Sequence, residues 1–130
     1  MTRASRILVV EDDQTLRETL GEVMTDDGHE VRLARDGREA LELLSGWEPD
    51  LLILDLMMPR MDAYRFREVQ RRDGVAPDAR VLILSAVPDL DAAARQLEAD
   101  AWVAKPFLLQ PMLDVINDLL DQRPEPPVST

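Results

Sequence analysis

Charged and hydroxyl side chains stand directly after four short apolar runs of this sequence. These residues are Glu11 with Asp12, then Asp55, Ser85 and Lys105. If the four runs are parallel strands of one sheet, their carboxyl ends share one edge, which is where ligands bind in open sheets. We therefore expect three carboxylates, one ammonium group and one hydroxyl to converge in one shallow site.

Three neighbouring carboxylates raise one another's pKa, so they do not all stay ionised without a cation. Lys105 supplies one positive charge, and a divalent ion is the simplest way to balance the rest. An open site of oxygen ligands suits Mg²⁺, which keeps several waters and accepts phosphate oxygens. A carboxylate, Mg²⁺, a lysine and a hydroxyl are the groups needed to move a phosphoryl group onto an aspartate. Asp55 is the best-placed nucleophile, with Lys105 and Ser85 beside the phosphoryl oxygens.

Each of these residues also has an ordinary structural interpretation. Glu11 and Asp12 could complement the dipole of the helix that follows them. Asp55 could be a turn residue, Ser85 a turn or capping hydroxyl, and Lys105 a solvated surface lysine. The joint pattern favours the functional interpretation, because independent coincidences would not all fall on one sheet edge.

The elements that must position these side chains follow from hydrophobic periodicity. Strand-like runs occupy residues 7–10, 30–34, 51–54, 81–84 and 101–104. Apolar residues at helical spacing follow every strand, and the last helix carries Pro111 in its first turn. Five strands alternating with five helices predict an α/β fold, a doubly wound parallel sheet with helices on both faces.

Composition limits the functions that such a domain can have. The chain has 130 residues, the length of one domain, with 15 Lys and Arg against 26 Asp and Glu, a net charge of −11. This charge disfavours binding to nucleic acid or to an anionic membrane. The sequence has no cysteine, which excludes disulfides and thiolate chemistry. Its one histidine, His29, excludes a two-histidine metal site and is expected to face solvent in a polar turn.

The two ends of the chain suggest where it works and how it is organised. No apolar run reaches the length of a membrane span, and the first residues do not resemble a secretory signal, so we expect a cytoplasmic protein. We expect the domain to occupy residues 1–122. The Pro-rich residues 123–130 are expected to form an extended tail or the start of a linker.

Over residues 5–121 the chain resembles the receiver domain of bacterial two-component response regulators. The matching motifs are ILVVEDD at 7–13, LDLMMP at 54–59, LSA at 84–86 and KPF at 105–107. The resemblance implies a flavodoxin-like (βα)5 fold with strand order 2-1-3-4-5. Such a receiver acts alone or as part of a longer regulator.

The resemblance also implies a phosphoacceptor and a metal site. Asp55 would accept a phosphoryl group from the phosphohistidine of a sensor histidine kinase or a histidine phosphotransfer protein. Glu11, Asp12, Asp55 and the backbone carbonyl of Met57 would hold Mg²⁺, for which Mn²⁺ could substitute. The domain would not be an enzyme beyond assisting its own phosphotransfer and slow dephosphorylation.

The remaining family motifs imply a conformational switch. Lys105, followed by a cis bond to Pro106, would contact the phosphoryl group, and Ser85 would move toward it. Trp102 stands where the family keeps a switching Tyr or Phe, although it could also be a half-buried core aromatic. The switch would alter the surface formed by the fourth helix, fifth strand and fifth helix, and so signal to an effector protein or output domain. The domain would be a monomer or a phosphorylation-dependent homodimer, with no contact to nucleic acid or membrane.

Three positions depart from the family pattern. Ala63 replaces a glycine, and if that position needs a positive φ the alanine is strained by about 1 kcal/mol and the loop is reshaped. Where the family often has a Gly-Ala pair this chain has Glu98-Ala99, so glutamate stands in place of glycine, which could alter the turn before the fifth strand. Trp102 is bulkier than Tyr and lacks its hydroxyl, so the inward state is expected to be harder to reach.

The positions two residues after Asp55 and Ser85 are expected to set the rate of dephosphorylation. They are Met57 and Val87, and in the family such positions flank the path of the attacking water. Neither side chain can orient a water or act as a base, which predicts slow hydrolysis. Met57 and its neighbour Met58 otherwise have the character of packing residues.

Two other classes of protein compete with this interpretation. A phosphatase of the haloacid dehalogenase type also uses an aspartate at a strand end, but it needs a second aspartate where this chain has Met57, and a cap domain. A pseudo-receiver keeps the fold and signals by contact alone, but such proteins usually lose an acidic residue or the lysine, and this chain retains them all.

Overall fold

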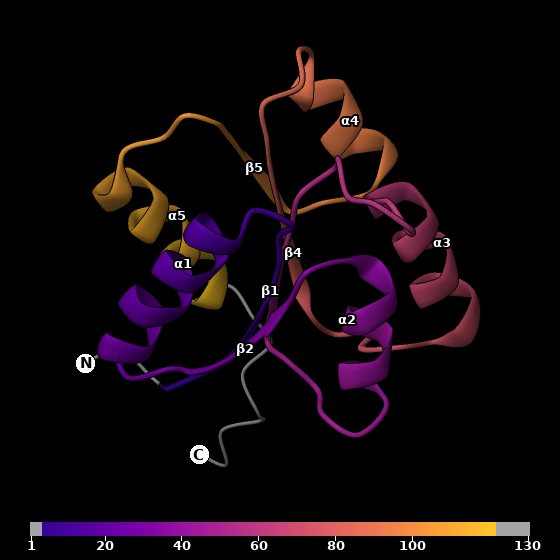
Figure 1. Cartoon of the computed structure of the whole chain (residues 1–130), viewed down its shortest axis with the longest axis horizontal. Helices are drawn as coiled ribbons and strands as arrows, with labels where there is room; N and C mark the ends of the chain where they lie inside the picture. The colour runs from indigo at the N-terminus through magenta and orange to yellow at the C-terminus, as the bar shows by residue number, and fades with distance from the viewer. Residues whose placement is uncertain (1–3, 122–130) are drawn as a thin grey trace, which may run out of the picture.

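The computed structural model describes residues 4–121, which form a parallel sheet between two layers of helices (Figure 1). In chain order the elements are β1 (Arg6–Val10), α1 (Gln14–Asp26), β2 (Glu30–Ala34), α2 (Gly37–Leu44), β3 (Leu51–Leu54), α3 (Ala63–Asp73), β4 (Arg80–Ser85), α4 (Leu90–Gln96), β5 (Ala101–Ala104) and α5 (Leu109–Asp121). The strand order is β2-β1-β3-β4-β5, and every pairing is parallel. The predicted doubly wound, flavodoxin-like sheet is therefore confirmed.

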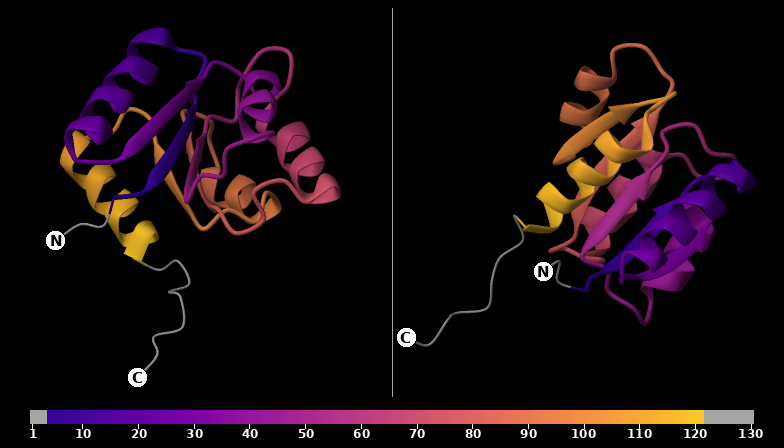
Figure 2. Two further views of the ribbon diagram at one scale, coloured as in Figure 1. Left: turned by 90° about the horizontal axis from the view of Figure 1, so that it is seen from below. Right: turned by 90° about the vertical axis from the view of Figure 1, so that its left-hand side faces the viewer.

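Alternate side chains of the central strands supply two separate cores. Leu8 and Val10 of β1 lie in the core beneath α2, α3 and α4, which contains Phe66. Ile7 and Val9 point to the opposite face, where α1 and α5 pack. Figures 1 and 2 show these two helical layers on either side of the sheet. Because both faces are covered, the inner strands are continuous apolar runs, and their polar residues are confined to the strand ends.

Aspartates begin the three helices that follow β1, β2 and β3. The side chains of Asp13, Asp36 and Asp62 each accept a hydrogen bond of 2.9 Å from a backbone N–H of the first helical turn. These N-caps start α1, α2 and α3 at fixed places beside the carboxyl edge of the sheet. The cap at Asp62 makes Ala63 the first residue of α3.

The expectation of a strained Ala63 is wrong. Ala63 is buried, and it is not among the described residues with positive φ. The left-handed residue in this loop is Arg60, three positions earlier, with a φ of 65°. Alanine is therefore accommodated at the helix start.

The turn before β5 does contain a residue in the left-handed region. Glu98 has a φ of 55° where the family often has glycine. Arg67 of α3 donates to the carbonyl of Leu97 at 2.9 Å and to that of Glu98 at 3.3 Å, and Arg71 pairs with the Glu98 carboxylate at 2.9 Å. The turn forms without glycine because α3 holds it from outside.

His29 is buried, so the expectation that it faces solvent is wrong. Its Nδ1 accepts the backbone N–H of Ser5 at 3.1 Å, and the backbone N–H of His29 donates to the carbonyl of Met24 at 3.1 Å. The turn after α1 folds back over the start of β1, which encloses the imidazole.

The predicted tail at 123–130 and the domain boundary at residue 122 lie outside the described residues and stay predictions. Among residues 4–121, none of the helices combines the length and apolar character that crossing a bilayer requires.

Candidate metal centre at the carboxyl edge of the sheet

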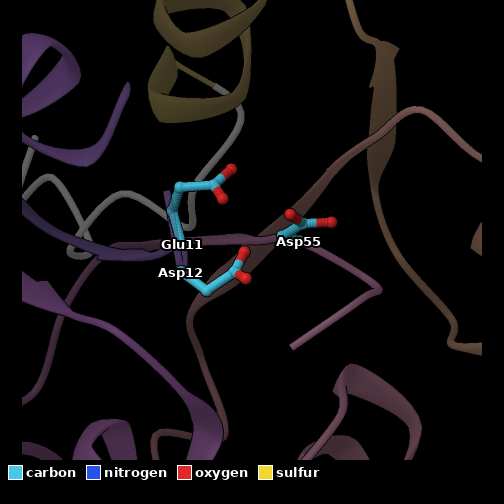
Figure 3. Close-up of side chains that lie close together, drawn as sticks. All are labelled: Glu11, Asp12 and Asp55. Atoms are coloured by element: carbon cyan, nitrogen blue, oxygen red, sulfur yellow. The ribbon is translucent and has the colours of Figure 1, made fainter. Parts of the chain in front are cut away.

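Glu11, Asp12 and Asp55 meet at the carboxyl edge of the sheet, as predicted. One carboxylate oxygen from each lies within 4.8 Å of the others, and Figure 3 shows the three side chains around a common space. The parallel register places them there: Val10 pairs with Leu54, and the N–H of Asp55 donates to the carbonyl of Val10 at 3.0 Å. The acidic pair and the aspartate thus follow adjacent strands at the same level.

Lys105 reaches the same space from the end of β5. Its Nζ lies 2.6 Å from Oε1 of Glu11 and 2.9 Å from Oδ2 of Asp55. The backbone N–H of Lys105 donates to the carbonyl of Ser85 at 2.9 Å, which continues the β4–β5 ladder by one residue. The peptide bond between Lys105 and Pro106 is cis, as the resemblance implied.

Burial sets the electrostatics of this cluster. Burial raises the pKa of Glu11 to about 7, although hydrogen bonds from Lys105 and from the N–H of Asp13 oppose the shift. Burial also acts to lower the pKa of Lys105, but its hydrogen bonds to Glu11 and Asp55 outweigh that effect and raise the pKa above its usual value. Lys105 therefore stays an ammonium ion, while Glu11 exchanges a proton near neutrality.

Both oxygens of Asp55 have partners, and the side chain is buried. Oδ2 contacts Lys105, and Oδ1 accepts the backbone N–H of Met57 at 3.1 Å. This second bond fixes the start of the β3–α3 loop against the carboxylate. Asp12, by contrast, is exposed and opens the cluster to solvent.

The predicted switch and hydrolysis residues differ in how far they are exposed to solvent. Ser85 is buried at the end of β4, and Val87 is half-buried against the core. Trp102 on β5 is 43% exposed, with its indole N–H 3.3 Å from Oδ1 of Asp91. Met58 packs in the core as expected, but Met57 is 66% exposed, so the prediction that it packs is wrong.

The structure adds contacts that the sequence patterns did not indicate. Arg17 of α1 donates to the backbone carbonyls of Glu11 at 2.7 Å and Asp12 at 3.3 Å, which ties the β1–α1 loop to the helix. Arg60, in the β3–α3 loop, pairs with Asp36 at the start of α2. The contact of Arg17 could have been predicted, because a basic residue in the first turns of a helix can reach back to the loop before it, here the loop of the acidic pair. No local signal points to the Arg60 contact.

The donor set fits a hard divalent cation. All three side chains offer carboxylate oxygens, and the one ammonium among them cannot balance three ionised carboxylates. Glu11 is 1% exposed and buried ionised carboxylates need compensating charge. The cluster therefore has the composition and charge of a Mg²⁺ site open on the Asp12 side.

A parallel (βα)5 sheet with an acidic cluster, a lysine and a hydroxyl at its carboxyl edge defines a class of signalling domain. The sequence model of the response regulator receiver domain matches residues 7–117 of this chain. The chain therefore belongs to the response regulator receiver domain family of two-component signalling.

Individual relatives agree with this assignment. The chain is 39% identical over 117 residues to the response regulator MprA of Mycolicibacterium vanbaalenii, covering 88% of this chain and 50% of that protein. Among solved structures, the non-phosphorylated HemR receiver domain of Leptospira biflexa aligns with a TM-score of 0.79 at 31% identity, covering 92% of this chain and 98% of that one. The chemotaxis protein CheY4 of Vibrio cholerae aligns with a TM-score of 0.81 at 27% identity, covering 90% and 99%. The chain spans about half the length of the curated relatives it matches.

Proposed function

We propose that this domain takes a phosphoryl group onto Asp55 from the phosphohistidine of a sensor histidine kinase or a histidine phosphotransfer protein. The observation that carries the proposal is the position of Lys105, whose Nζ contacts both Asp55 and Glu11 at the carboxyl edge of the sheet. One ammonium held against the acceptor carboxylate is placed to neutralise an incoming phosphoryl group.

The transfer makes one bond and breaks one. An Oδ of Asp55 attacks phosphorus in line, and the P–N bond breaks with its electron pair left on the imidazole nitrogen. The phosphohistidine ring is already protonated on its other nitrogen, so it leaves as neutral imidazole. Lys105 then shifts its contact from Asp55 to a phosphoryl oxygen, and the hydroxyl of Ser85 donates to another.

Glu11, Asp12, Asp55 and the backbone carbonyl of Met57 are the groups that would hold Mg²⁺, or Mn²⁺ in its place. A cation held there would contribute positive charge for the phosphoryl group. Within the chain itself, the N–H of Met57 orients one oxygen of Asp55, which leaves the carboxylate in a defined position for attack.

An apolar groove beside Lys105 fits the donor protein. It has a volume of about 550 Å³ and lies between α1 and the β5–α5 connection, lined mainly by Leu16, Leu20, Phe107 and Leu109. Because Lys105 borders it, a helix seated in this groove would bring its phosphohistidine next to Asp55. We assign the groove to the phosphohistidine-bearing helix of the donor. A donor of this class would also make the cytoplasm the place where the domain works.

The output surface would be the one formed by α4, β5 and α5. Movement of Ser85 toward the phosphoryl group would open space for Trp102, whose indole now points outward. The surface of α4, β5 and α5 would change with it and alter the binding of an effector protein or output domain, or pair the domain with a second copy.

Intact mass after incubation with acetyl phosphate tests the phosphoacceptor. A single phosphoryl adduct that requires Mg²⁺ is expected, and it should be absent in Asp55→Asn but present in the exposed control Asp114→Asn. A folded protein that takes up no phosphoryl group would contradict the proposal and favour a pseudo-receiver.

A further inference from the structure

An ion pair between the half-exposed Arg60 and the buried Asp36 joins the β3–α3 loop to the start of α2. Arg60 donates to Oδ2 of Asp36 through Nε, at 2.7 Å, and also through Nη2. Asp36 is buried, and its other oxygen accepts the N–H of Glu39 at 2.9 Å. One carboxylate thus caps α2 and anchors a loop 24 residues away in sequence.

Arg60 stabilises the ionised form of Asp36. Burial acts to raise the pKa of Asp36, but the bonds from the N–H of Glu39 and from Arg60 outweigh it and lower the pKa below its usual value. Asp36 therefore carries its negative charge inside the protein, where a charge-assisted bond from a guanidinium is strong.

The neighbouring residues form a second contact at the same place. A Cβ at Gly37 would lie 3.0 Å from both Cγ and the carbonyl oxygen of Met61, so the loop approaches the helix as closely as glycine allows. Arg60 itself has a φ of 65°, a region that disfavours residues with a Cβ. Two adjacent loop residues, Arg60 and Met61, are thus held against Asp36 and Gly37.

The anchored loop begins directly after the acidic cluster. Its first residues follow Asp55, and the N–H of Met57 donates to Oδ1 of Asp55 at 3.1 Å. The loop is therefore fixed at one end by the phosphoacceptor and at the other by the Arg60–Asp36 pair. The backbone between these points has little freedom to reorient the Met57 carbonyl.

We propose that Arg60 and Asp36 are positioning residues for the metal centre, holding the β3–α3 loop so that the Met57 carbonyl is available as a ligand before the cation binds. This inference rests on the proposed function, which gives Met57 its role. Partners that orient a ligand typically change metal affinity by about 10- to 100-fold when they are removed.

The test compares loop exchange and Mg²⁺ binding in Arg60→Gly, Asp36→Asn and wild-type protein. Glycine removes the guanidinium without backbone strain at a φ of 65°, and asparagine keeps the oxygen that caps α2 while disrupting the contact with Arg60. Arg35→Gln is the matched control, because it deletes an arginine that pairs with Glu39 of the same helix at 3.2 Å. Hydrogen exchange of residues 56–61 is measured in metal-free protein, and the Mg²⁺ dissociation constant is measured by calorimetry.

In both test variants we expect loop amides to exchange about tenfold faster and Mg²⁺ to bind about tenfold more weakly. Arg60→Lys should bind Mg²⁺ more tightly than Arg60→Gly but more weakly than wild type, since lysine keeps the positive charge but cannot make both guanidinium hydrogen bonds to Asp36. Arg35→Gln should behave as wild type in both measurements.

Two outcomes overturn the proposal. The first is an Arg60→Gly variant whose loop exchanges hydrogen and binds Mg²⁺ as the wild-type protein does. The second is an Asp36→Asn variant that melts at a lower temperature while its loop exchange and its Mg²⁺ affinity stay unchanged. If wild-type protein binds Mg²⁺ and accepts a phosphoryl group while the variants match it, the positioning role alone fails. If wild-type protein does neither, the proposed function itself fails.

Discussion

The ammonium nitrogen of Lys105 lies 2.6 Å from Oε1 of Glu11, a carboxyl group that is almost completely buried. This contact does not keep Glu11 fully ionised at neutral pH, because burial raises its pKa to about 7 even with the lysine beside it. Near pH 7 the metal-free domain is therefore partly protonated at Glu11, one of the groups that would hold Mg²⁺.

Mg²⁺ affinity should consequently depend on pH. Binding requires the ionised carboxylate, so we expect the apparent affinity to fall as pH drops below about 7, by at most about tenfold per pH unit. Calorimetry between pH 6 and 8 in buffers of different ionisation enthalpy would measure both affinity and proton release. Glu11→Gln should bind Mg²⁺ more weakly and without this pH dependence. A flat profile in wild-type protein would contradict the expectation.

The stability of the metal-free domain should follow the opposite trend. A carboxyl whose pKa is 4.5 unfolded and about 7 folded binds more protons in the folded state. Its contribution is therefore fully present below pH 4.5 and is lost as pH rises through about 7. Denaturant unfolding in metal-free buffer should show higher stability at pH 6.0 than at pH 7.5, and Glu11→Gln should show less of this difference.

The lifetime of phosphorylated Asp55 should be long because the nearby positions Met57 and Val87 are apolar. Met57 is largely exposed and cannot orient a water molecule for attack. Changing Met57→Asn together with Val87→Glu should accelerate loss of the phosphoryl group by about 100-fold. The decay is followed by intact mass after removal of acetyl phosphate. Leu108→Asn, a change at another exposed apolar residue, should leave the decay rate unaltered, and an unchanged rate in the double variant would refute the idea.

Much of this site could be predicted because it depends on strand ends. Asp55, Ser85 and Lys105 stand at the carboxyl ends of apolar strands, and parallel pairing brings strand ends to one edge whatever the details of packing. The resemblance to the receiver family implied the strand order. The structure has this order, and it has the parallel pairing that brings the strand ends together.

The contacts that could not be predicted are made by side chains from distant segments. Arg60 and Asp36 are 24 residues apart, and their pairing depends on how the β3–α3 loop rests on α2. His29 looked like a surface residue because its neighbours are polar, whereas its burial depends on how the turn folds over β1. Local sequence carries no information about either arrangement.

The outward position of Trp102 should be stabilised by Asp91. The indole N–H lies 3.3 Å from Oδ1 of Asp91, and Arg95 pairs with the other oxygen of that carboxylate at 2.9 Å. Removing the acceptor with Asp91→Ala should favour the inward state. We expect beryllofluoride with Mg²⁺ to protect Trp102 from acrylamide quenching more strongly in Asp91→Ala than in wild type. Arg95→Gln, which leaves the indole its acceptor, should resemble wild type, and equal protection in all three would contradict the role of Asp91.

The turn before β5 should depend on Arg67 because Glu98 is in the left-handed region. The guanidinium of Arg67 donates to the carbonyls of Leu97 and Glu98 and, at 2.7 Å, to Oε1 of Gln70. Arg67→Met keeps the apolar stem but loses these bonds, and we expect it to lower the free energy of unfolding by about 2 kcal/mol. Glu98→Gly should raise it by up to about 1 kcal/mol, since glycine relieves the strain while the exposed ion pair to Arg71 contributes little.

The two changes should not be additive. If Arg67 holds a strained turn in place, its loss matters less once glycine has removed the strain. The double variant should therefore be more stable than the sum of the single effects predicts, by about 0.5 kcal/mol or more. Urea unfolding of the four proteins at pH 7.5 gives the coupling free energy directly. A coupling of zero would mean that Arg67 stabilises α3 and α4 independently of the backbone conformation of Glu98.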